Sequence, residues 1–541
     1  MPKRILIVGG VAGGMSAATR LRRLDEFAEI VVFERGPYVS FANCGLPYHI
    51  GGEIADRAKL IVQTPERLRA VFKLDIRANT EVLCVQPKDK TVVTSVGTEQ
   101  YDELILATGS TAVLPTTPGI GRPGHFFLRT IPDLDGILAW IQTKSAKTAL
   151  ILGGGYIGLE VAEQLHRLGL AVTIVEKNPQ LLKPLDPEMA AHVHLELKKH
   201  GVTVHLQNPV VQFDDAGALL QNGERIRADV VIIGVGVRPN VTLAQAAGLK
   251  IGTSGGIEVN KKLQTSDPHI WAVGDAIEVT HGATLTTAVI PLAGPANRQG
   301  RIVADNICGM NSEYQGTLGT AIVRVFDVVA ACTGANESLL TSVGINYEAI
   351  HLHPNSHAGY YPGAKSLAIK ILFAPENGRL FGAQAVGEDG VDKRIDVFAT
   401  ALYAGMTIDD LAELELAYAP PFGSAKDPVN LAGMAAQNLL TGLVRVAQWY
   451  DVPKLLETGV LVDVREPAES DGGLIPGSMS IPLGELRSRL TELPKDRDIL
   501  VHCASGQRSY NACRILMQHG YKCWNLTGSY KTWKAAQGVP L

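Results

Sequence analysis

Several features are missing from this 541-residue chain, and each absence excludes a class of protein. No run of about 18 apolar residues is present, so we expect no membrane-spanning helix. The formal net charge is −4 and no run of Lys or Arg occurs, which argues against a nucleic-acid or membrane-surface partner. The chain begins Met-Pro-Lys-Arg and enters a predicted strand at once, so we expect no signal peptide and a cytoplasmic location.

Paired cysteines are missing as well. The seven cysteines are an odd number, lie far apart and form no Cys-x-x-Cys pair. Neither a disulfide framework nor a zinc site is therefore supported, and we expect no metal and a reducing compartment. Two of the seven stand in loops suited to hold a thiolate. They are Cys44, in Ser-Phe-Ala-Asn-Cys-Gly-Leu-Pro-Tyr, and Cys503, in His-Cys-Ala-Ser-Gly-Gln-Arg-Ser.

A first glycine-rich turn follows a short apolar strand and reads Gly-Gly-Val-Ala-Gly-Gly from Gly9 to Gly14. A helix pattern over Met15–Leu24 comes next, and then a second strand that ends at Glu34. This βαβ pattern is typical of dinucleotide binding, with the pyrophosphate at the helix N-terminus and the carboxylate on the adenosine ribose. Val11 departs from the glycine of the strict motif, so the prediction depends on the strand, the helix and Glu34 together.

A second glycine-rich turn is stricter. It follows a predicted strand over Thr148–Leu152, and a helix and a strand ending at Glu176 come after it. All three required glycines are present: Gly153, Gly155 and Gly158. Two such units in one chain are far more specific than one. Glu176 favours NADH, because a carboxylate bonds a ribose 2′-hydroxyl and repels a 2′-phosphate, but the adjacent Lys177 keeps NADPH open.

Two more apolar strands complete this pattern, one ending at Gly109 and one running from Ile270 to the Gly-Asp pair that ends at Asp275. With these motifs the chain resembles the flavoprotein disulfide reductases, in which the nicotinamide domain is inserted into the FAD domain. The resemblance implies that Asp275 holds the ribityl chain of the flavin. It implies FAD binding by Gly9, Gly10, Gly14, Glu34, Gly109 and Asp275, and NAD(P)H binding by Gly153, Gly155, Gly158 and Glu176.

Cys44 has no second cysteine beside it, whereas most reductases of this fold carry two, four residues apart. A single cysteine cannot close an internal disulfide and must cycle through a mixed disulfide, a persulfide or a sulfenic acid. We expect a helix start, the flavin and nearby basic groups to lower the pKa of Cys44 and favour its nucleophilic thiolate.

The loop around Cys44 resembles that of coenzyme A-disulfide reductases and their persulfide-reducing relatives, which carry Ser-Phe-x-x-Cys-Gly-Leu-Pro-Tyr. NADH peroxidases and water-forming NADH oxidases instead place a histidine in the first glycine turn, where this chain has Ala12. The resemblance implies a homodimer, coenzyme A bound at Ser16, Arg20, Arg23, Ser40, Asn43 and Lys426, and two active-site tyrosines, Tyr418 and Tyr360. Spacing favours Tyr360 over Tyr361. A solvated helix face stays open as the alternative for Arg20 and Arg23.

The C-terminal segment resembles a rhodanese domain. Cys503 follows an apolar strand, and a helix is expected over Tyr510–His519. Such a loop turns successive backbone N–H groups toward one point, which stabilises a thiolate or persulfide anion. Arg508 adds positive charge to this loop. It follows Cys503 in a Cys-x4-Arg spacing, whereas the phosphatases of this fold carry a longer Cys-x5-Arg loop. Asp463-Val464-Arg465 and Ile475-Pro476-Gly477-Ser478 match the other markers of the domain.

The expected architecture is α/β with several domains, because a chain of this length exceeds one hydrophobic core. We expect two Rossmann-like dinucleotide-binding domains, an α+β interface domain and a C-terminal rhodanese domain. The predicted bounds are 1–111 with 250–320 for FAD, 112–249 for NAD(P)H, 321–441 for dimerisation and 446–541 for rhodanese.

The leading hypothesis is an FAD-dependent NAD(P)H oxidoreductase that reduces coenzyme A persulfide, polysulfide or coenzyme A disulfide at Cys44. Cys503 would handle sulfane sulfur, and Tyr360, Tyr418 and Arg508 would assist the two cysteines. A plain coenzyme A-disulfide reductase with an accessory rhodanese domain is one alternative. A redox-sensing or sulfur-carrier flavoprotein is another, and would show negligible turnover alongside a stable protein complex.

Overall fold

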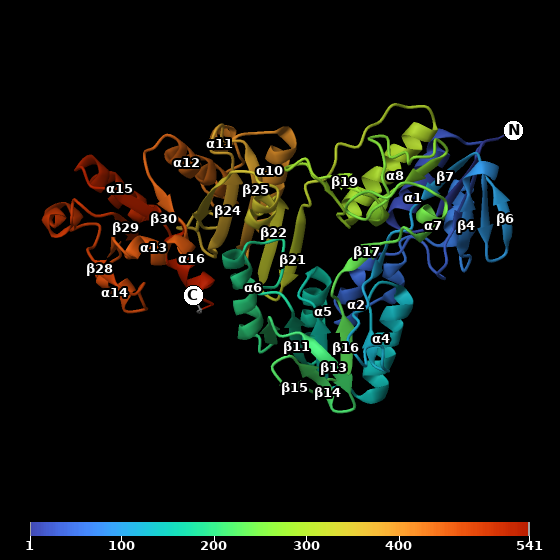
Figure 1. Ribbon diagram of the computed structural model, residues 1–541, viewed down its shortest axis with the longest axis horizontal. Coiled ribbons are helices and arrows are strands. Elements are labelled where there is room, and N and C mark those ends of the chain that lie inside the picture. The colour runs from blue at the N-terminus through green and yellow to red at the C-terminus, as the bar shows by residue number, and fades with distance from the viewer. Residues whose placement is uncertain (1, 539–541) are drawn as a thin grey trace. The chain divides into compact units, whose positions relative to one another are not determined.

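The computed structural model describes residues 2–538, which fall into two compact units. One unit comprises the chain through Pro179 together with Val202–Gly319, and the other comprises Gln180–Gly201 together with the chain from Thr320 onward (Figure 1). Among the described residues, no helix has both the length and the apolar character needed to cross a membrane.

The first unit begins with a five-stranded parallel sheet that contains the first glycine-rich turn. Its order is β18 (Ile270–Ala272), β7 (Glu103–Leu106), β1 (Arg4–Val8), β2 (Glu29–Phe33) and β3 (Asp75–Arg77). Helices α1 (Ala12–Leu24) and α8 (Ala293–Ile307) pack against each other beside it. Because β1 lies at the centre and α1 follows it, the turn opens at the carboxyl edge of the sheet, where such sheets bind ligands.

A second parallel sheet in the same unit repeats this plan. Its order is β12 (Thr203–Leu206), β11 (Ala171–Glu176), β10 (Thr148–Leu152), β16 (Val230–Ile233) and β9 (His125–Phe126), with helices α4 (Ile131–Lys144) and α5 (Tyr156–Arg167). The central strand is again the one that leads into the glycine-rich turn. The remaining elements of the unit are the antiparallel sheets β4 (Val82–Gln86), β5 (Thr91–Thr94), β6 (Gly97–Gln100) and β13 (Val210–Asp214), β14 (Gly217–Leu220), β15 (Arg225–Ile226), the pairs β8 (Ser110–Ala112) with β17 (Val237–Pro239) and β19 (Val279–Thr280) with β20 (Thr287–Ala288), and helices α2 (Leu46–Ile50), α3 (Pro65–Phe72) and α7 (Thr242–Ala246).

The second unit contains a five-stranded antiparallel sheet and a smaller parallel one. The antiparallel order is β21 (Ala321–Val325), β22 (Val328–Gly334), β25 (Leu380–Gly387), β24 (Leu367–Phe373) and β23 (Glu348–Leu352). Its helices are α6 (Pro187–Lys199), α9 (Glu337–Ser342), α10 (Val391–Ala404), α11 (Ile408–Glu413) and α12 (Pro428–Leu440). Helix α6 comes from the earlier segment of the chain and packs on β22 and β25.

The C-terminal sheet is parallel, with the order β26 (Val446–Ala447), β30 (Cys523–Leu526), β29 (Ile499–His502), β27 (Val460–Asp463) and β28 (Ser478–Ser480). Its helices are α13 (Val452–Leu456), α14 (Pro467–Ser470), α15 (Gln507–Gln518) and α16 (Ser529–Ala536). Strand β29 is central, so Cys503 lies at the carboxyl edge of the sheet, directly before α15.

Polar contacts join the C-terminal layer to the antiparallel sheet within this unit. The His351 amide donates to Thr527 Oγ1 over 2.8 Å, and Trp449 Nε1 donates to Glu188 Oε2 over 3.1 Å. Glu188 also accepts from Lys370, a fully buried lysine whose Nζ lies 2.6 Å from Glu188 Oε1. Burial of a charge is costly unless it is paired and hydrogen-bonded. Trp449 supplies one of the hydrogen bonds that stabilise the buried Glu188–Lys370 ion pair.

Two parallel sheets with glycine-rich turns, an antiparallel sheet and a small parallel sheet confirm the predicted α/β architecture. Two predicted helix starts were late. Helix α1 begins at Ala12 instead of Met15, and α15 begins at Gln507 instead of Tyr510. The first turn of α1 was not predicted because Gly13 and Gly14 have low helix propensity. The first turn of α15 was not predicted because its first three residues are polar and show no apolar periodicity.

Candidate active sites

Close backbone packing shapes the first glycine-rich turn. A Cβ atom at Gly14 would lie 1.9 Å from the carbonyl oxygen of Gly9, so only glycine fits there. The Gly10 amide donates to Glu34 Oε2 and the Gly36 amide to Glu34 Oε1, each over 2.9 Å. Glu34 is thereby oriented at the end of β2, the position expected of a ribose-binding carboxylate.

The second turn has the same arrangement. A Cβ at Gly158 would lie 2.2 Å from the Gly153 oxygen, and Glu176 Oε2 accepts from the Gly154 amide over 2.9 Å. Nothing lies within 4 Å of a Cβ placed at Gly155, so the backbone there is open to a ligand. A bound dinucleotide needs this combination of a tight turn, an open glycine and a helix N-terminus, so both turns fit the pyrophosphate of a dinucleotide.

Asp275 lies beside the strand end that carries Gly109. Because β18 and β7 are parallel neighbours, their carboxyl ends meet at one edge of the sheet. Ser110 Oγ donates to Asp275 Oδ2 over 2.8 Å, and Arg129 Nη2 donates to Ser110 Oγ over 3.0 Å. Gly109 has a φ of 65°, a left-handed conformation that glycine adopts without strain. This edge supplies the polar groups that the FAD prediction requires.

Cys44 is exposed and lies in the short 3-10 turn Asn43–Gly45 that leads into α2. Asn43 Oδ1 accepts from the Cys44 amide over 3.0 Å and from its Sγ at 3.6 Å. Ser40, nearby in the same loop, has a φ of 47° and donates its amide to the Gly10 oxygen over 2.8 Å. The cysteine loop is therefore fastened to the first glycine-rich turn.

The prediction that groups of the protein lower the pKa of Cys44 was wrong. Burial of the thiol raises the pKa of Cys44, and the carboxylates Glu160 and Asp275 raise it further. The predicted basic groups do not appear among these influences, because the neighbouring helix α5 presents Glu160 to the site instead. The protein around Cys44 therefore favours the thiol over the thiolate.

Glu160 was missed from the sequence. It lies on α5, and its Oε1 accepts from Tyr48 Oη over 3.0 Å. Tyr48 lies on α2, directly after the Cys44 turn, so the two parallel-sheet domains of the first unit meet at this contact. Burial raises the pKa of Glu160. The available signal was its position, two residues after Gly158 of the second turn.

Most of the predicted binding face on α1 is engaged in packing against α8. Ser16 Oγ donates to Asn297 Oδ1 over 2.5 Å, and Arg20 Nε donates to Asp305 Oδ1 over 2.8 Å. The solvated face, which was the alternative for both arginines, does not describe Arg20 because its guanidinium is ion-paired and largely buried. Arg23 is exposed and is therefore the more accessible of the two.

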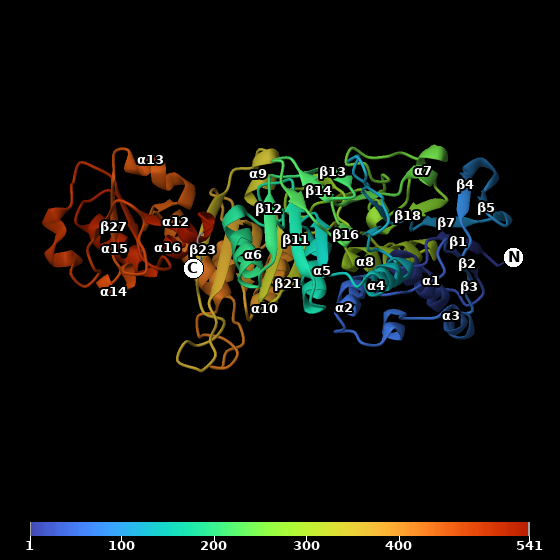
Figure 2. The same cartoon turned by 90° about the horizontal axis from the view of Figure 1, so that it is seen from below.

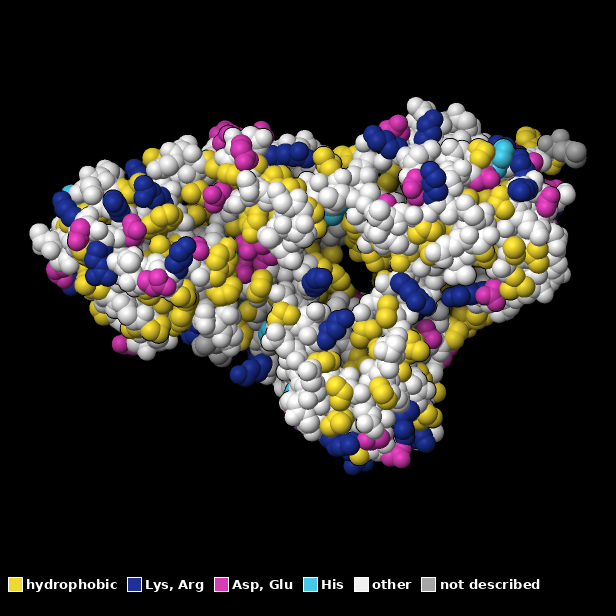
Figure 3. Space-filling model, viewed as in Figure 1, with side chains coloured by type: hydrophobic (Ala, Val, Ile, Leu, Met, Phe, Trp, Pro, Cys, Tyr) yellow, Lys and Arg dark blue, Asp and Glu magenta, His cyan; other side chains and the backbone are white. Residues whose placement is uncertain are grey.

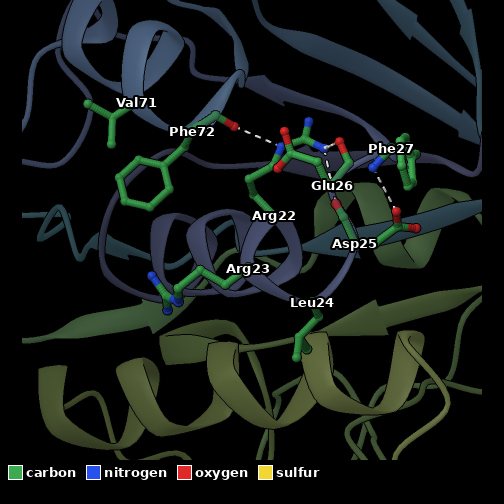
Figure 4. Close-up of a pocket in the computed structure, with 8 residues that line it drawn as sticks. All are labelled: Arg22, Arg23, Leu24, Asp25, Glu26, Phe27, Val71 and Phe72. Carbon is green, nitrogen blue, oxygen red and sulfur yellow. Dashed lines mark hydrogen bonds between the residues drawn. The ribbon is translucent and has the colours of Figure 1, made fainter.

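Arg23 lines an open cavity of about 520 Å³ at the end of α1 (Figure 4). The neighbouring Arg22 does not offer its charge there, because its Nε donates to the Phe72 oxygen over 2.8 Å and its Nη1 to the Glu26 oxygen over 2.7 Å. Figure 4 shows Arg22 directed toward these carbonyl groups and Arg23 on the other side of the helix.

Two loops of the second unit bring the predicted tyrosines together. The Ala358 amide donates to the Gly423 oxygen over 2.9 Å, and Tyr360 Oη lies 2.9 Å from Tyr418 Oη. In Figure 2 the two segments, gold and orange, project together from the antiparallel sheet. Tyr361 instead packs its ring against His357, with ring centroids 5.7 Å apart. Tyr360, the residue that spacing favours, is therefore the one of the two that pairs with Tyr418.

These loops also expose aromatic surface. Tyr360 is 76% exposed, Tyr418 48% and Phe422 71%. Lys426 is exposed nearby, and the buried Asp427 beside it accepts from Arg394 Nη2 over 3.0 Å, which fixes the start of α12. A group of exposed aromatic side chains on anchored loops is typical of a surface that a partner covers.

Hydrogen-bond donors surround the thiol of Cys503, which is 1% exposed. Its Sγ accepts from the Gly506 amide over 3.1 Å and from Ser509 Oγ over 3.5 Å. Burial raises the pKa of this thiol, but the Ser509 hydroxyl and the amides of Ser509, Gly506 and Ser505 outweigh burial and lower the pKa of Cys503. The loop has the anion-holding geometry that its sequence suggested.

Arg508 is paired with a carboxylate that sequence reasoning missed. Its Nη1 and Nη2 each donate to Glu469 over 2.6 Å. The Glu469 carboxylate and the nearby Cys503 sulfur both raise the pKa of Arg508. Arg465 in turn donates to Asp463 Oδ2 over 2.6 Å and through Nη1 to the Glu469 carbonyl oxygen over 3.3 Å, so the marker Asp-Val-Arg holds helix α14, which carries Glu469. The sequence signal that could have pointed to Glu469 was its position four residues after Arg465 of the Asp-Val-Arg marker.

Replacing Ser509 with alanine is expected to raise the pKa of Cys503 by about one unit, because a hydrogen bond to a charged group contributes roughly 1.5–3 kcal/mol. The rate of iodoacetamide alkylation of Cys503 against pH measures it. Ser505→Ala is the matched control, since Ser505 contributes only its amide. An unchanged midpoint in Ser509→Ala, or an equal shift in Ser505→Ala, contradicts the assignment.

Charges of both signs are interspersed on the face shown in Figure 3, where Lys and Arg lie among Asp and Glu. The near balance of 50 basic and 54 acidic residues over the chain agrees with that view. This face therefore has no broad positively charged surface that would attract a polyanion such as a nucleic acid.

Comparisons with protein families match the whole arrangement. Residues 3–300 match the family described as pyridine nucleotide-disulphide oxidoreductase, and residues 320–428 match the dimerisation domain of that name. Residues 448–536 match the rhodanese-like domain.

Individual relatives cover most or all of the chain. The coenzyme A disulfide reductase of Staphylococcus haemolyticus is 36% identical over 444 residues, which span 81% of this chain and 100% of the relative. The structure of reduced Bacillus anthracis CoADR-RHD is 48% identical, with a TM-score of 0.97 over 99% of this chain and 98% of that one. A NAD-dependent persulfide reductase from A. fulgidus is 37% identical, with a TM-score of 0.92 over 98% of this chain and 100% of that one.

Proposed function

This chain belongs to the pyridine nucleotide-disulphide oxidoreductase family, and we propose that it reduces coenzyme A persulfide, polysulfide or coenzyme A disulfide at Cys44. The observation that carries the proposal is the single exposed cysteine in a loop fastened to the first glycine-rich turn, in a chain that also has a rhodanese loop. Relatives named for coenzyme A disulfide and for persulfide support the substrate class.

FAD at the first turn, with NAD(P)H at the second, supplies when bound the two electrons that return oxidised Cys44 to its thiolate. The chain's own part is sulfur exchange. Because the surrounding protein raises the pKa of Cys44, the thiol first loses its proton to solvent. The resulting thiolate attacks a sulfur of coenzyme A disulfide, the substrate S–S bond breaks, and one coenzyme A thiolate leaves and takes up a proton while the other half stays bonded to Cys44. With coenzyme A persulfide the departing group is hydrosulfide or the coenzyme A thiolate, according to the sulfur attacked.

The roles proposed for the tyrosines follow from their mutual hydrogen bond. In the Tyr360–Tyr418 pair one hydroxyl donates and the other accepts, so one phenol retains a proton to donate to a departing thiolate. The hydrogen bond to Tyr418 raises the pKa of Tyr360. Because these tyrosines are exposed and lie in the matched dimerisation region, we place them at a homodimer interface facing the partner's site.

Coenzyme A is proposed to bind near Cys44 through Ser40 and Asn43, with phosphates at Arg23 and with Lys426. Arg20 and Ser16 contact α8 in this structure and would need to exchange those contacts. The bounds predicted for the four domains and a reducing, cytoplasmic location belong to the same proposal. None of the seven cysteines, all of which lie among the described residues, forms a disulfide, which agrees with such a location.

Cys503 is proposed to accept sulfane sulfur as a persulfide and to supply it for reduction at Cys44. Its lowered pKa supports a nucleophilic thiolate, and the surrounding donors suit a persulfide anion equally. A plain coenzyme A-disulfide reductase with an accessory rhodanese domain is the second candidate, because the curated relative covering 81% of this chain carries that name.

Steady-state kinetics with the two substrates separate these functions. The proposal predicts that the holoenzyme oxidises NADH with a kcat/KM at least about tenfold higher for coenzyme A persulfide than for coenzyme A disulfide, a difference of about 1.4 kcal/mol in transition-state binding. NADPH, compared in the same assays, is expected to be the poorer donor because of Glu176. A preference for the disulfide supports the second candidate, and no turnover with either contradicts both.

A further inference from the structure

Two cysteines outside the proposed chemistry lie against each other in the core of the rhodanese domain. Cys513 is on α15 and Cys523 is the first residue of β30, and they are 0% and 1% exposed. Cys523 Sγ lies 3.5 Å from the Cys513 carbonyl oxygen, so the two cysteines are in direct contact. Sequence reasoning gave them no role, because ten residues separate them and neither stands in a recognisable loop.

The two thiols differ in acidity, as in a reactive dithiol. Burial raises the pKa of Cys513 well above its ordinary value. The hydrogen bond from Cys513 lowers the pKa of Cys523, and the Arg445 and Arg514 guanidinium groups lower it further. Cys523 is therefore the group that forms a thiolate, and Cys513 is the partner that retains its proton.

A small reagent has a short path to this pair. Cys523 follows a turn in which Gln518, His519, Gly520 and Lys522 are exposed, whereas Tyr521 is buried and donates to the Leu490 oxygen over 2.6 Å. Gly520 has a φ of 81°, and the turn connects α15 to β30. Opening of such a turn exposes the adjacent strand end without unfolding the sheet.

We propose that Cys513 and Cys523 form a redox-active dithiol that a hydroperoxide converts to an internal disulfide. The Cys523 thiolate attacks one peroxide oxygen, the O–O bond breaks, and a sulfenic acid and hydroxide result. The Cys513 sulfur then displaces the hydroxyl group from Cys523, its proton leaves with that group as water, and the S–S bond forms. Two electrons pass from the two sulfurs to the peroxide.

The disulfide acts on Cys503 through α15. Ser509, which donates to Cys503 Sγ over 3.5 Å, lies one helical turn before Cys513 on the same buried face. Closing the disulfide brings the two sulfurs to about 2.05 Å, which draws α15 toward β30. We expect sulfur acceptance by Cys503 to fall about tenfold, since a displacement near 1 Å costs up to a hundredfold in a catalytic site. This consequence rests on the proposed function of Cys503, whereas the disulfide itself does not.

Tryptic peptide mapping tests the disulfide directly. Cleavage after Arg508, Arg514 and Lys522 places Cys503, Cys513 and Cys523 on three different peptides. After treatment of the full holoenzyme with hydrogen peroxide, we expect a peptide from Ser509–Arg514 linked to one that begins at Cys523, and separation of the two by dithiothreitol. The absence of this linked pair, or a link from Cys513 to Cys503 instead, overturns the proposal.

Activity measurements test the consequence. Cyanide is first used to remove any sulfane sulfur already bound at Cys503, and the rate of persulfide formation at Cys503 is then measured. In peroxide-treated protein this rate should be about tenfold lower than in untreated protein, and reduction with dithiothreitol should restore it. Cys513→Ala and Cys523→Ala should keep the untreated rate and lose the peroxide response. Cys332→Ala, which removes a buried cysteine from β22, should respond as the unsubstituted protein does. A linked pair with no change in rate overturns the connection to Cys503.

Discussion

Replacing Cys44 with serine is expected to lower kcat/KM for NAD(P)H-dependent reduction of coenzyme A persulfide or disulfide by about a thousandfold or more. Serine cannot form the mixed disulfide or persulfide, and removing a covalent nucleophile costs losses of this order. No second cysteine can replace it, since the six others lie outside its loop. Steady-state NADH oxidation with each substrate measures the effect.

Two controls separate loss of chemistry from loss of structure. Cys84→Ser changes another partly buried cysteine of the first unit, on β4, and should leave kcat/KM nearly unchanged. Flavin content and NADH-dependent ferricyanide reduction should be equal in the unsubstituted protein, Cys44→Ser and Cys84→Ser, because neither property uses the Cys44 thiol. Retention of persulfide or disulfide reduction by Cys44→Ser contradicts the mechanism.

Replacing Cys503 with serine is expected to abolish sulfur acceptance, with a loss of about a thousandfold or more, because the persulfide forms on that sulfur. Reduction of coenzyme A disulfide supplied from solution should stay within about twofold, since the proposed reaction at Cys44 does not use Cys503. Cyanide-trapped thiocyanate reports the first activity and NADH oxidation the second.

The two cysteine variants serve as controls for each other. Cys44→Ser should keep sulfur acceptance at Cys503, and Cys503→Ser should keep disulfide reduction at Cys44. If either substitution eliminates both activities while the protein remains folded and FAD-bound, the division of labour between the two cysteines is wrong.

The parts of the fold that depend on local rules were predictable from the sequence. Each glycine-rich turn is a short-range pattern, because Gly14 must pass the Gly9 oxygen and Gly158 must pass the Gly153 oxygen. Glu34 and Glu176 end the next strand in each unit, where both carboxylates accept amides of their own turn. Strand, turn, helix and acid are all encoded within about 30 residues.

Contacts between distant segments could not be predicted in this way. Arg20 pairs with Asp305 of α8, and Glu160 of α5, not a basic group, contributes to the raised pKa of Cys44. Both outcomes depend on which helix packs beside the site, and a single sequence does not encode that locally. The Arg508 and Glu469 pair is another case, because it joins the first turn of α15 to α14, and the two residues lie 39 positions apart along the chain.

The tyrosines show that adjacent residues of the same type can have different contacts in the fold. Tyr360 and Tyr361 are adjacent and chemically identical, so their spacing from other motifs separates them weakly. In the structure, Tyr360 Oη meets Tyr418 Oη, whereas Tyr361 packs against His357. The contact between two loops that lie 58 residues apart along the chain carries that information.

Peptide mass spectrometry of Cys44 after incubation with coenzyme A disulfide, without NAD(P)H, tests the central claim most directly. Trypsin releases Cys44 on the peptide Gly36–Arg57, apart from every other cysteine. The account predicts one coenzyme A joined to this peptide through a disulfide and its release when NADH is added to the holoenzyme. An unmodified Cys44, or Cys44 in an internal disulfide with another cysteine of the chain, would contradict it.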